Sequence, residues 1–234
     1  MKLTAQQIVS IFPKAAPFAE HMAVTADRYN INTTLRQAHW LAQMAVESGG
    51  YTVVRESLNY AATALVPLFG SHRITQAQAH KYGRRSGQRA NQEAIANIVY
   101  GGAWGFKNLG NTEPGDGWWF IGRGLKQTTG RSNYTRTSMA LFGDTRLLGS
   151  PQVLEDAEWA ALSSGTFWQY SGLNALADTG DVARVTKRVN GGTNGLAERR
   201  GWTARCLEAL SARPDFSGVT VHVTSTAKLV KGGE

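Results

Sequence analysis

One buried helix that ends in a tight chain reversal is the feature that most constrains this fold. Over residues 35–46 apolar side chains recur at three- and four-residue steps, the period of a helix with one buried face, at Leu35, Ala38, Leu41, Ala42, Ala45 and Val46. Glu47 closes the run, and Gly49 and Gly50 follow at once. Glycine after a periodic run ends a helix and lets the chain reverse. The sequence therefore predicts a buried central helix with a carboxylate at its end, followed by a turn back.

A second carboxylate, Glu56, follows nine residues after Glu47. In an unbroken helix the two would lie roughly 13 Å apart along the axis and about half a turn apart in direction, so they could not share a substrate. After the reversal Glu56 can face Glu47 across a cleft, the arrangement that inverting glycoside hydrolysis requires. We expect Glu47, at the end of an apolar helix, to stay protonated as acid and Glu56, beside Arg55, to act as base. Two solvated surface glutamates fit the spacing as well.

Four sequence blocks resemble a known family. They are His39–Tyr51, Glu56–Tyr60, Gly122–Tyr134 and Val189–Gly195. In this order they look like the signature blocks of family 19 chitinase-like glycoside hydrolases, and they are most similar to the bacteriophage endolysin branch. The resemblance covers about residues 35–205. Plant members of the family are disulfide-bonded, whereas this chain has the single cysteine Cys206, which we expect to be a core residue.

The resemblance also implies roles for individual residues. Thr129 falls on the family's hydroxyl residue that holds the attacking water, which a base alone could not aim at the anomeric carbon. Thr128 is its neighbour, and in an extended segment only one of the two can point into the cleft. Arg199 falls on an arginine close to the catalytic carboxylates, where a cation would help to keep Glu56 ionised. Substrate contacts are implied for Gln127, Tyr134, Asn190, Arg199, Asn59 and Tyr60. A helix C-cap is the other interpretation of Asn190.

The expected architecture is a mainly α-helical, lysozyme-like α+β domain with a small β element after the central helix. Residues 1–212 would form the catalytic domain, and residues 213–234 a C-terminal tail that is flexible or adds an edge strand. Residues 101–117 read as a long glycine-rich loop, a kind of segment that is rarely without function in compact domains. Further helices are predicted at residues 4–12, 18–30, 91–100, 133–142, 153–170 and 182–189.

A net charge of +8 and a pI near 9.8 imply an anionic partner. The basic segment 73–89 contains Arg73, Lys81, Arg84, Arg85 and Arg89 without an acidic residue. This segment is either a solvated face or a patch for anionic cell-envelope polymers beside the cleft. No nucleic-acid motif accompanies the charge, so we expect no nucleic-acid partner. We expect a monomer without a transmembrane segment.

The histidines and the cysteine show no pattern typical of a zinc amidase or of a peptidase. The five histidines have no metal-ligand spacing, and no Cys-His or Ser-His arrangement is suggested, so we expect neither a metal nor another cofactor. His39 lies about two helical turns before Glu47 and is expected to be a structural neighbour of it.

The resemblance therefore predicts an endolysin that hydrolyses the β-1,4 glycan of peptidoglycan, with inversion and as a muramidase-type enzyme. No signal peptide is recognised, so the protein would be made in the host cytoplasm and reach the wall after holin-dependent release. A chitinase acting on poly-N-acetylglucosamine and a non-catalytic wall-binding protein are the alternatives. A lytic transglycosylase is a weaker one, because it would need one acid and no water-directing base.

Overall fold

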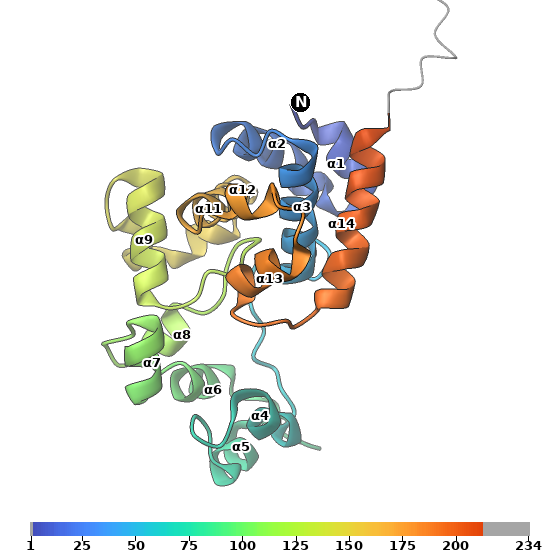
Figure 1. Cartoon of the computed structure of the whole chain (residues 1–234). Helices are drawn as coiled ribbons and strands as arrows, with labels where there is room; N and C mark the ends of the chain where they lie inside the picture. The colour runs from blue at the N-terminus through green and yellow to red at the C-terminus, as the bar shows by residue number, and fades with distance from the viewer. Residues whose placement is uncertain (1, 213–234) are drawn as a thin grey trace, which may run out of the picture.

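The helix α3 (Thr34–Glu47) lies at the centre of the larger of two lobes in the computed structural model, which describes residues 2–212 (Figure 1). Thr33 begins the helix by accepting a hydrogen bond from the backbone N of Arg36 at 3.2 Å. Most of the predicted apolar face is buried, with only its end residues Leu35 and Val46 partly exposed. The polar side chains of Gln37, His39 and Gln43 are buried as well. The helix is therefore enclosed on nearly every side, which fixes the position of Glu47.

The other elements of the larger lobe pack around α3. Its core joins residues from the first and last helices of the described chain, and the contact between α3 and α14 is the most extensive between any two elements there. The elements are α1 (Ala5–Ile11), η1 (Pro13–Phe18), α2 (Ala19–Arg28), α11 (Ala157–Tyr170), α12 (Leu173–Ala177), α13 (Val182–Asn190) and α14 (Leu196–Ser211).

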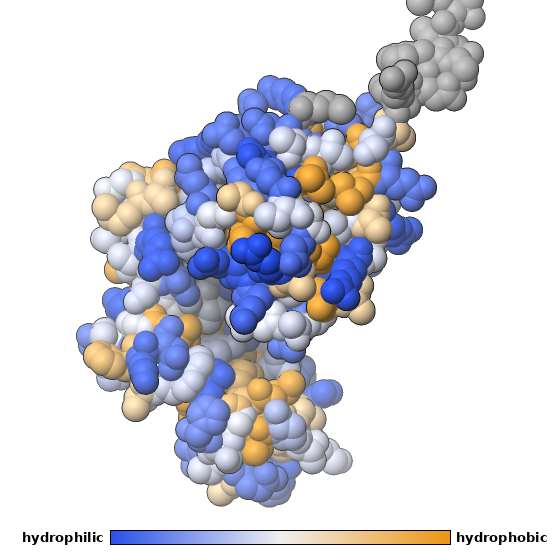
Figure 2. Space-filling model, viewed as in Figure 1, coloured by the Kyte–Doolittle hydropathy of each residue, from blue (hydrophilic) through white to orange (hydrophobic). Residues whose placement is uncertain are grey.

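A smaller lobe and a bridging layer complete the described chain. The smaller lobe has a separate apolar core and contains α4 (Ala62–Phe69), α5 (Gln76–Tyr82), α6 (Gln92–Val99), α7 (Gly102–Leu109) and α8 (Asp116–Trp119). A third cluster belongs to α9 (Arg131–Phe142), α10 (Arg146–Gly149) and η2 (Pro151–Glu155). Figure 2 shows that the surface is hollowed between the two lobes.

The predicted reversal follows α3 directly. Gly49, Gly50 and Tyr51 all have positive φ, at 57°, 74° and 64°. Tyr51 tolerates this left-handed conformation because its buried ring is anchored, with the hydroxyl donating to the carbonyl of Leu41 at 2.8 Å. The turn sends the chain out of the larger lobe toward Glu56 and the smaller lobe.

Two expectations about secondary structure need correction. The small β element after α3 is reduced, within residues 2–212, to isolated bridges such as Arg55 with Arg123 and Arg123 with Thr128. Residues 101–117 are not one long loop, because α7 and α8 form within them. The glycines there allow close packing: a Cβ on Gly105 would lie 1.9 Å from the carbonyl oxygen of Tyr100. The predicted tail at 213–234 lies outside the described residues.

Cys206 is buried in the larger lobe, as expected, and burial raises the pKa of its thiol to about 12. No helix in residues 2–212 is both long and apolar enough to cross a membrane.

We expect His39 to make the stability of the larger lobe dependent on pH. Its ring is fully buried, and neither ring nitrogen has a hydrogen-bond partner in the described structure. Burial lowers the pKa of His39, an effect that the charge of Asp181 only partly opposes. Below a pH of about 6.5, His39 is therefore protonated in the unfolded chain more readily than in the native protein. The free energy of unfolding consequently decreases as pH falls.

We therefore expect urea denaturation at pH 5 and pH 7 to show that His39→Leu flattens this acid-side loss of stability. The exposed His72, changed to Leu, is the matched control and should retain the wild-type slope. An unchanged slope in His39→Leu would show that other groups cause the acid sensitivity.

Candidate active site

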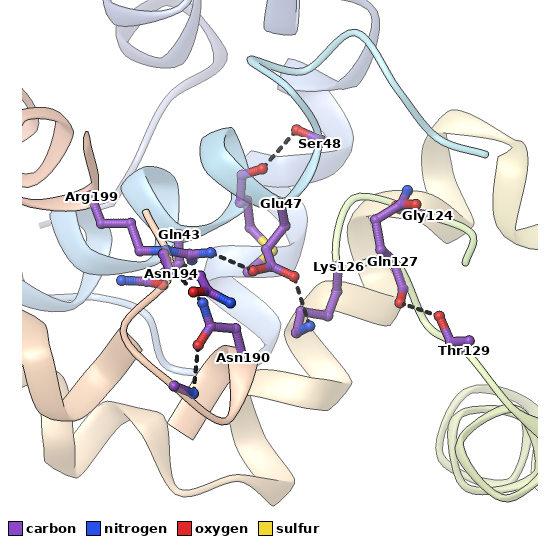
Figure 3. A network of polar contacts seen from close by, with 12 residues as sticks. Gln43, Glu47, Ser48, Gly124, Lys126, Gln127, Thr129, Asn190, Asn194 and Arg199 are labelled. Carbon is purple, nitrogen blue, oxygen red and sulfur yellow. Dashed lines mark hydrogen bonds and ion pairs between the residues drawn. The ribbon is translucent and has the colours of Figure 1, made fainter. Parts of the chain in front are cut away.

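Glu47 is held between two cations (Figure 3). Its Oε2 accepts a hydrogen bond from Nζ of Lys126 at 2.9 Å, and its Oε1 accepts one from Nη2 of Arg199 at 2.7 Å. Only 12% of the Glu47 side chain is exposed. We expected apolar surroundings for Glu47 from the helix pattern. The carboxylate instead contacts two cations, Lys126 from the segment after Gly122 and Arg199 from the start of α14.

Arg199 belongs to a buried network that connects three helices. Its Nη1 donates to Oε1 of Gln43, which lies one turn before Glu47 on α3. The Gln43 Nε2 in turn donates to Oγ1 of Thr186 on α13 at 3.2 Å. Arg199 lies beside one of the two glutamates, as predicted, but the carboxylate it contacts is Glu47 rather than Glu56. Arg199 therefore fixes the direction of the Glu47 side chain.

Glu56 is oriented by the smaller lobe and by the bridging segment. Its Oε1 accepts from the Tyr100 hydroxyl at 2.5 Å, and its Oε2 accepts from the backbone N of Gly122 at 3.1 Å. Its own backbone N donates to the Gly122 carbonyl at 2.8 Å. Donors on both oxygens suit an ionised carboxylate.

The polar surroundings that we expected from Arg55 come from other residues. Arg55 turns away from Glu56, lying over the Trp118 ring at 5.5 Å and 4.0 Å from Glu155. Tyr100 takes its place beside the carboxylate. Burial and then the Glu56 charge raise the pKa of Tyr100, so its hydroxyl stays a donor.

Tyr100→Phe removes one of the two donors to Glu56 and leaves the ring in place. We expect kcat to fall about tenfold while KM changes little, because the carboxylate becomes less firmly oriented but remains present. Steady-state kinetics on a soluble oligosaccharide measures both constants. A change confined to KM would assign Tyr100 to substrate binding instead.

Thr129 and Gln127 meet Glu56 around Gly122. A Cβ on Gly122 would lie 2.9 Å from Oε1 of Gln127, 3.2 Å from Oγ1 of Thr129 and 3.4 Å from Cβ of Glu56. Gln127 adopts φ of 58°, and its carbonyl accepts from the Thr129 hydroxyl at 3.0 Å. Thr128 instead pairs its backbone with Arg123 and is buried. The threonine hydroxyl that lies close to Gly122, the backbone partner of Glu56, is thus that of Thr129.

Gly122→Ala tests this convergence. The φ of Gly122 is not in the left-handed region, so an alanine is tolerated by the backbone and only its methyl group disturbs the site. We expect a loss of activity of roughly tenfold to a hundredfold, because small displacements of positioning groups have large effects on rate.

Gly201→Ala is the matched control, since a Cβ there meets nothing within 4 Å. Full activity in Gly122→Ala would show that the spacing around Gly122 is unimportant for the reaction.

Four further residues predicted to bind substrate occupy different environments. Tyr134 is fully buried, with its hydroxyl donating to the Ile121 carbonyl at 2.8 Å, so it offers no surface to a ligand here and instead braces the Gly122 segment. Asn190 accepts from the backbone N of Gly192 at 2.8 Å and shapes the loop into α14. Tyr60 is half-buried, and burial, together with the charge of Glu56, raises its pKa. Asn59 is exposed.

Three residues of this site were not predicted individually. Gln43 lies four residues before Glu47, and this spacing on one helix face could have indicated it. Lys126 stands within a recognised block, one residue before Gln127. Tyr100 has no local signal, because only the folding of α6 against the segment after α3 brings it to Glu56.

A recess of about 120 Å³ adjoins this site. Lys126, Gln127 and Thr129 form its polar side, while Leu109, Phe167 and Tyr170 supply apolar walls. Within residues 2–212 no group of three or more histidine, cysteine or acidic side chains is arranged to hold a metal ion. The functional groups at the site are two carboxylates, a hydroxyl and two cations.

Comparison with known proteins places this constellation in a family. No protein-family model matches the sequence. A protein of Haemophilus influenzae (strain Rd) described as a glycosyl hydrolase family 19 domain-containing protein is 32% identical over 191 residues, which cover 81% of this chain and 88% of the relative. The chain belongs to glycosyl hydrolase family 19. It is therefore a glycoside hydrolase, as its sequence blocks indicated.

Solved structures confirm the fold of this family 19 hydrolase. A bacterial family 19 chitinase has a TM-score of 0.57 at 17% identity, with 92% of this chain and 97% of the chitinase covered. Chitinase C from Streptomyces griseus HUT6037 has a TM-score of 0.54 at 18% identity, with 89% and 76% covered. The mainly helical, lysozyme-like architecture expected from the sequence is thus confirmed.

Proposed function

We propose that this family 19 hydrolase is an endolysin that cleaves the β-1,4 glycan of bacterial peptidoglycan with inversion. Glu47 would act as general acid, Glu56 as general base and Thr129 as the residue that positions the attacking water. The observation that carries this proposal is that Glu56, Gln127 and the Thr129 hydroxyl all lie close to Gly122. A water bound by the Glu56 carboxylate and the Thr129 hydroxyl would have both a base and a second hydrogen-bond partner to set its direction.

The contacts of Glu47 suggest how it could serve as the acid. It must carry a proton when the glycosidic oxygen leaves. Arg199 is buried and fixed by Gln43, so it would hold Oε1 in place throughout. Lys126 reaches Oε2 through a flexible stem, and its Nζ also lies 4.7 Å from the Phe167 ring. In our proposal substrate displaces this ammonium from Oε2, which takes up a proton from solvent and then donates it to the leaving group.

Net charge favours peptidoglycan over chitin as the substrate. A charge of +8 gains nothing from a neutral polymer of N-acetylglucosamine, whereas a polyanionic wall attracts it and accelerates encounter. Chitin remains the second candidate, because solved chitinases share the fold. Synthesis in the host cytoplasm, holin-dependent release and a monomeric state belong to the same proposal.

One of the five cations in the basic segment 73–89 does not contribute to its surface. Arg73 is withdrawn into the smaller lobe, where its guanidinium lies 3.6 Å from the Trp104 ring and donates to the Val99 carbonyl at 2.8 Å. The other four cations of the segment, Lys81, Arg84, Arg85 and Arg89, are exposed. Any contact with anionic envelope polymers would use these exposed cations.

Mass spectrometry of the fragments released from purified peptidoglycan, beside a chitin oligomer, tests this function. Reducing N-acetylmuramic acid ends would establish a muramidase, and reducing N-acetylglucosamine ends a glucosaminidase with the same machinery. Cleavage of chitin alone would move the assignment to chitinase. Absence of cleavage of both substrates would favour a non-catalytic wall-binding protein.

A further inference from the structure

The outer face of α13 carries a cluster of cations that the fold does not use. Arg184, Lys187 and Arg188 follow the i, i+3, i+4 spacing and are exposed, while Val185 and Val189 face the core. We name these three residues the α13 basic face. Like charges at this spacing repel one another and slightly destabilise a helix. Its presence therefore needs an explanation other than stability.

No acidic side chain of the described chain neutralises the α13 basic face. None of its three cations forms an ion pair with residues 2–212. The two acids that precede the helix have other partners. Asp181 caps α13 by accepting from the backbone N of Ala183 at 2.9 Å, and Asp178 binds Arg36 at 2.6 Å. The positive charge of this face thus remains available to an external anion.

The same three cations line a recess. Together with Leu176 they surround a volume of about 580 Å³ that is open to solvent. Figure 2 shows hydrophilic surface over the position of α13, with apolar surface beside it, at the border of the hollow between the lobes. A ligand that fits here has carboxylate or phosphate groups and at least one small apolar group to meet Leu176.

The position of α13 ties this recess to the active site. The helix ends at Asn190, and the loop after it leads to Arg199, the partner of Glu47. Arg188, Lys187 and Arg184 therefore precede Asn190 by roughly 3, 4.5 and 9 Å along the helix axis. A substrate bound beside Glu47 could therefore place an anionic group of its own against these three cations.

We propose that the α13 basic face and Leu176 form a subsite for the carboxylate-bearing peptide stems of a peptidoglycan strand. Each extended stem residue spans about 3.5 Å, so two or three residues on a bound muramic acid cover the length of the recess. Arginine forks pair with carboxylates bidentately, and Leu176 meets the alanine methyl groups. This inference rests on the proposed substrate class and adds that the enzyme recognises the peptide as well as the sugar.

Binding of labelled glycan strands to the inactive Glu56→Gln protein tests the subsite. One probe keeps its peptide stems, and the other has lost them to an amidase. The triple variant Arg184→Gln/Lys187→Gln/Arg188→Gln is expected to bind peptide-bearing strands about tenfold more weakly, with unchanged binding of stripped strands. The control Lys2→Gln/Lys14→Gln/Arg205→Gln removes the same charge at three exposed positions that do not line the recess, and it should bind both probes normally.

Three outcomes would overturn the subsite. They are an equal loss on both probes, no loss on either, and a loss confined to a polyphosphate probe, which would indicate a site for phosphate polymers. Urea denaturation confirms that the triple variant is folded. Cleavage assays separate this question from the proposed function: if the wild type cleaves only chitin, the function fails, while a stem-dependent binding loss in the triple variant would still support the subsite.

Discussion

Glu56→Gln is expected to lower kcat by about 10³-fold, because general acid–base groups of this kind contribute roughly 10² to 10⁴. The amide keeps the shape of the side chain but cannot take a proton from water. Glu47→Gln should cause a comparable loss by removing the proton donor. Kinetics on peptidoglycan strands or chitin oligomers measures both effects.

Glu208→Gln, an exposed change on α14, is the control and should retain full activity. Activity that survives Glu56→Gln but not Glu47→Gln would contradict the two-carboxylate mechanism. Anhydro ends on the products would then identify a lytic transglycosylase, which needs one acid and no activated water.

Arg199→Leu is expected to lower the free energy of unfolding by about 3 kcal/mol, the lower end of the range for breaking a buried ion pair. The Arg199 side chain is 4% exposed, and its loss leaves Gln43 without its donor and Glu47 with a single cation. Lys126 still neutralises the carboxylate, which is why the loss is not larger. Urea denaturation measures it.

Arg200→Leu, at the exposed neighbouring position, is the control and should change stability by less than about 0.5 kcal/mol. Because the broken contact with Glu47 causes much of the loss, Glu47→Gln/Arg199→Leu should be more stable than the sum of the two single changes predicts. Strict additivity would show that Arg199 and Glu47 do not stabilise each other.

The sequence was most informative where local pattern and chemistry coincide. The apolar period of α3, its end at Glu47 and the glycine reversal could be predicted because each depends on neighbours in the chain. Family blocks then selected the correct fold and indicated Thr129 over Thr128, which the geometry around Gly122 supports.

The electrostatic partners could not be predicted in the same way. Lys126, Arg199 and Tyr100 reach the carboxylates from segments 44 to 152 residues away, so their contacts depend on how the lobes fold rather than on spacing. For the same reason the roles of Arg55 and Arg199 were misassigned to Glu56, and the burial of Tyr134 was missed. The glycines at 101–117 were interpreted as a loop because the sequence alone does not distinguish glycines in a flexible loop from glycines that allow close helix packing.

The stereochemistry of the first product tests the central claim most directly. If Glu56 activates a water that attacks the anomeric carbon, a proton NMR time course on a β-linked substrate should show the α-anomer first, followed by slow mutarotation. Initial release of the β-anomer would contradict this account, because it would require a covalent or substrate-assisted intermediate instead of a directly attacking water.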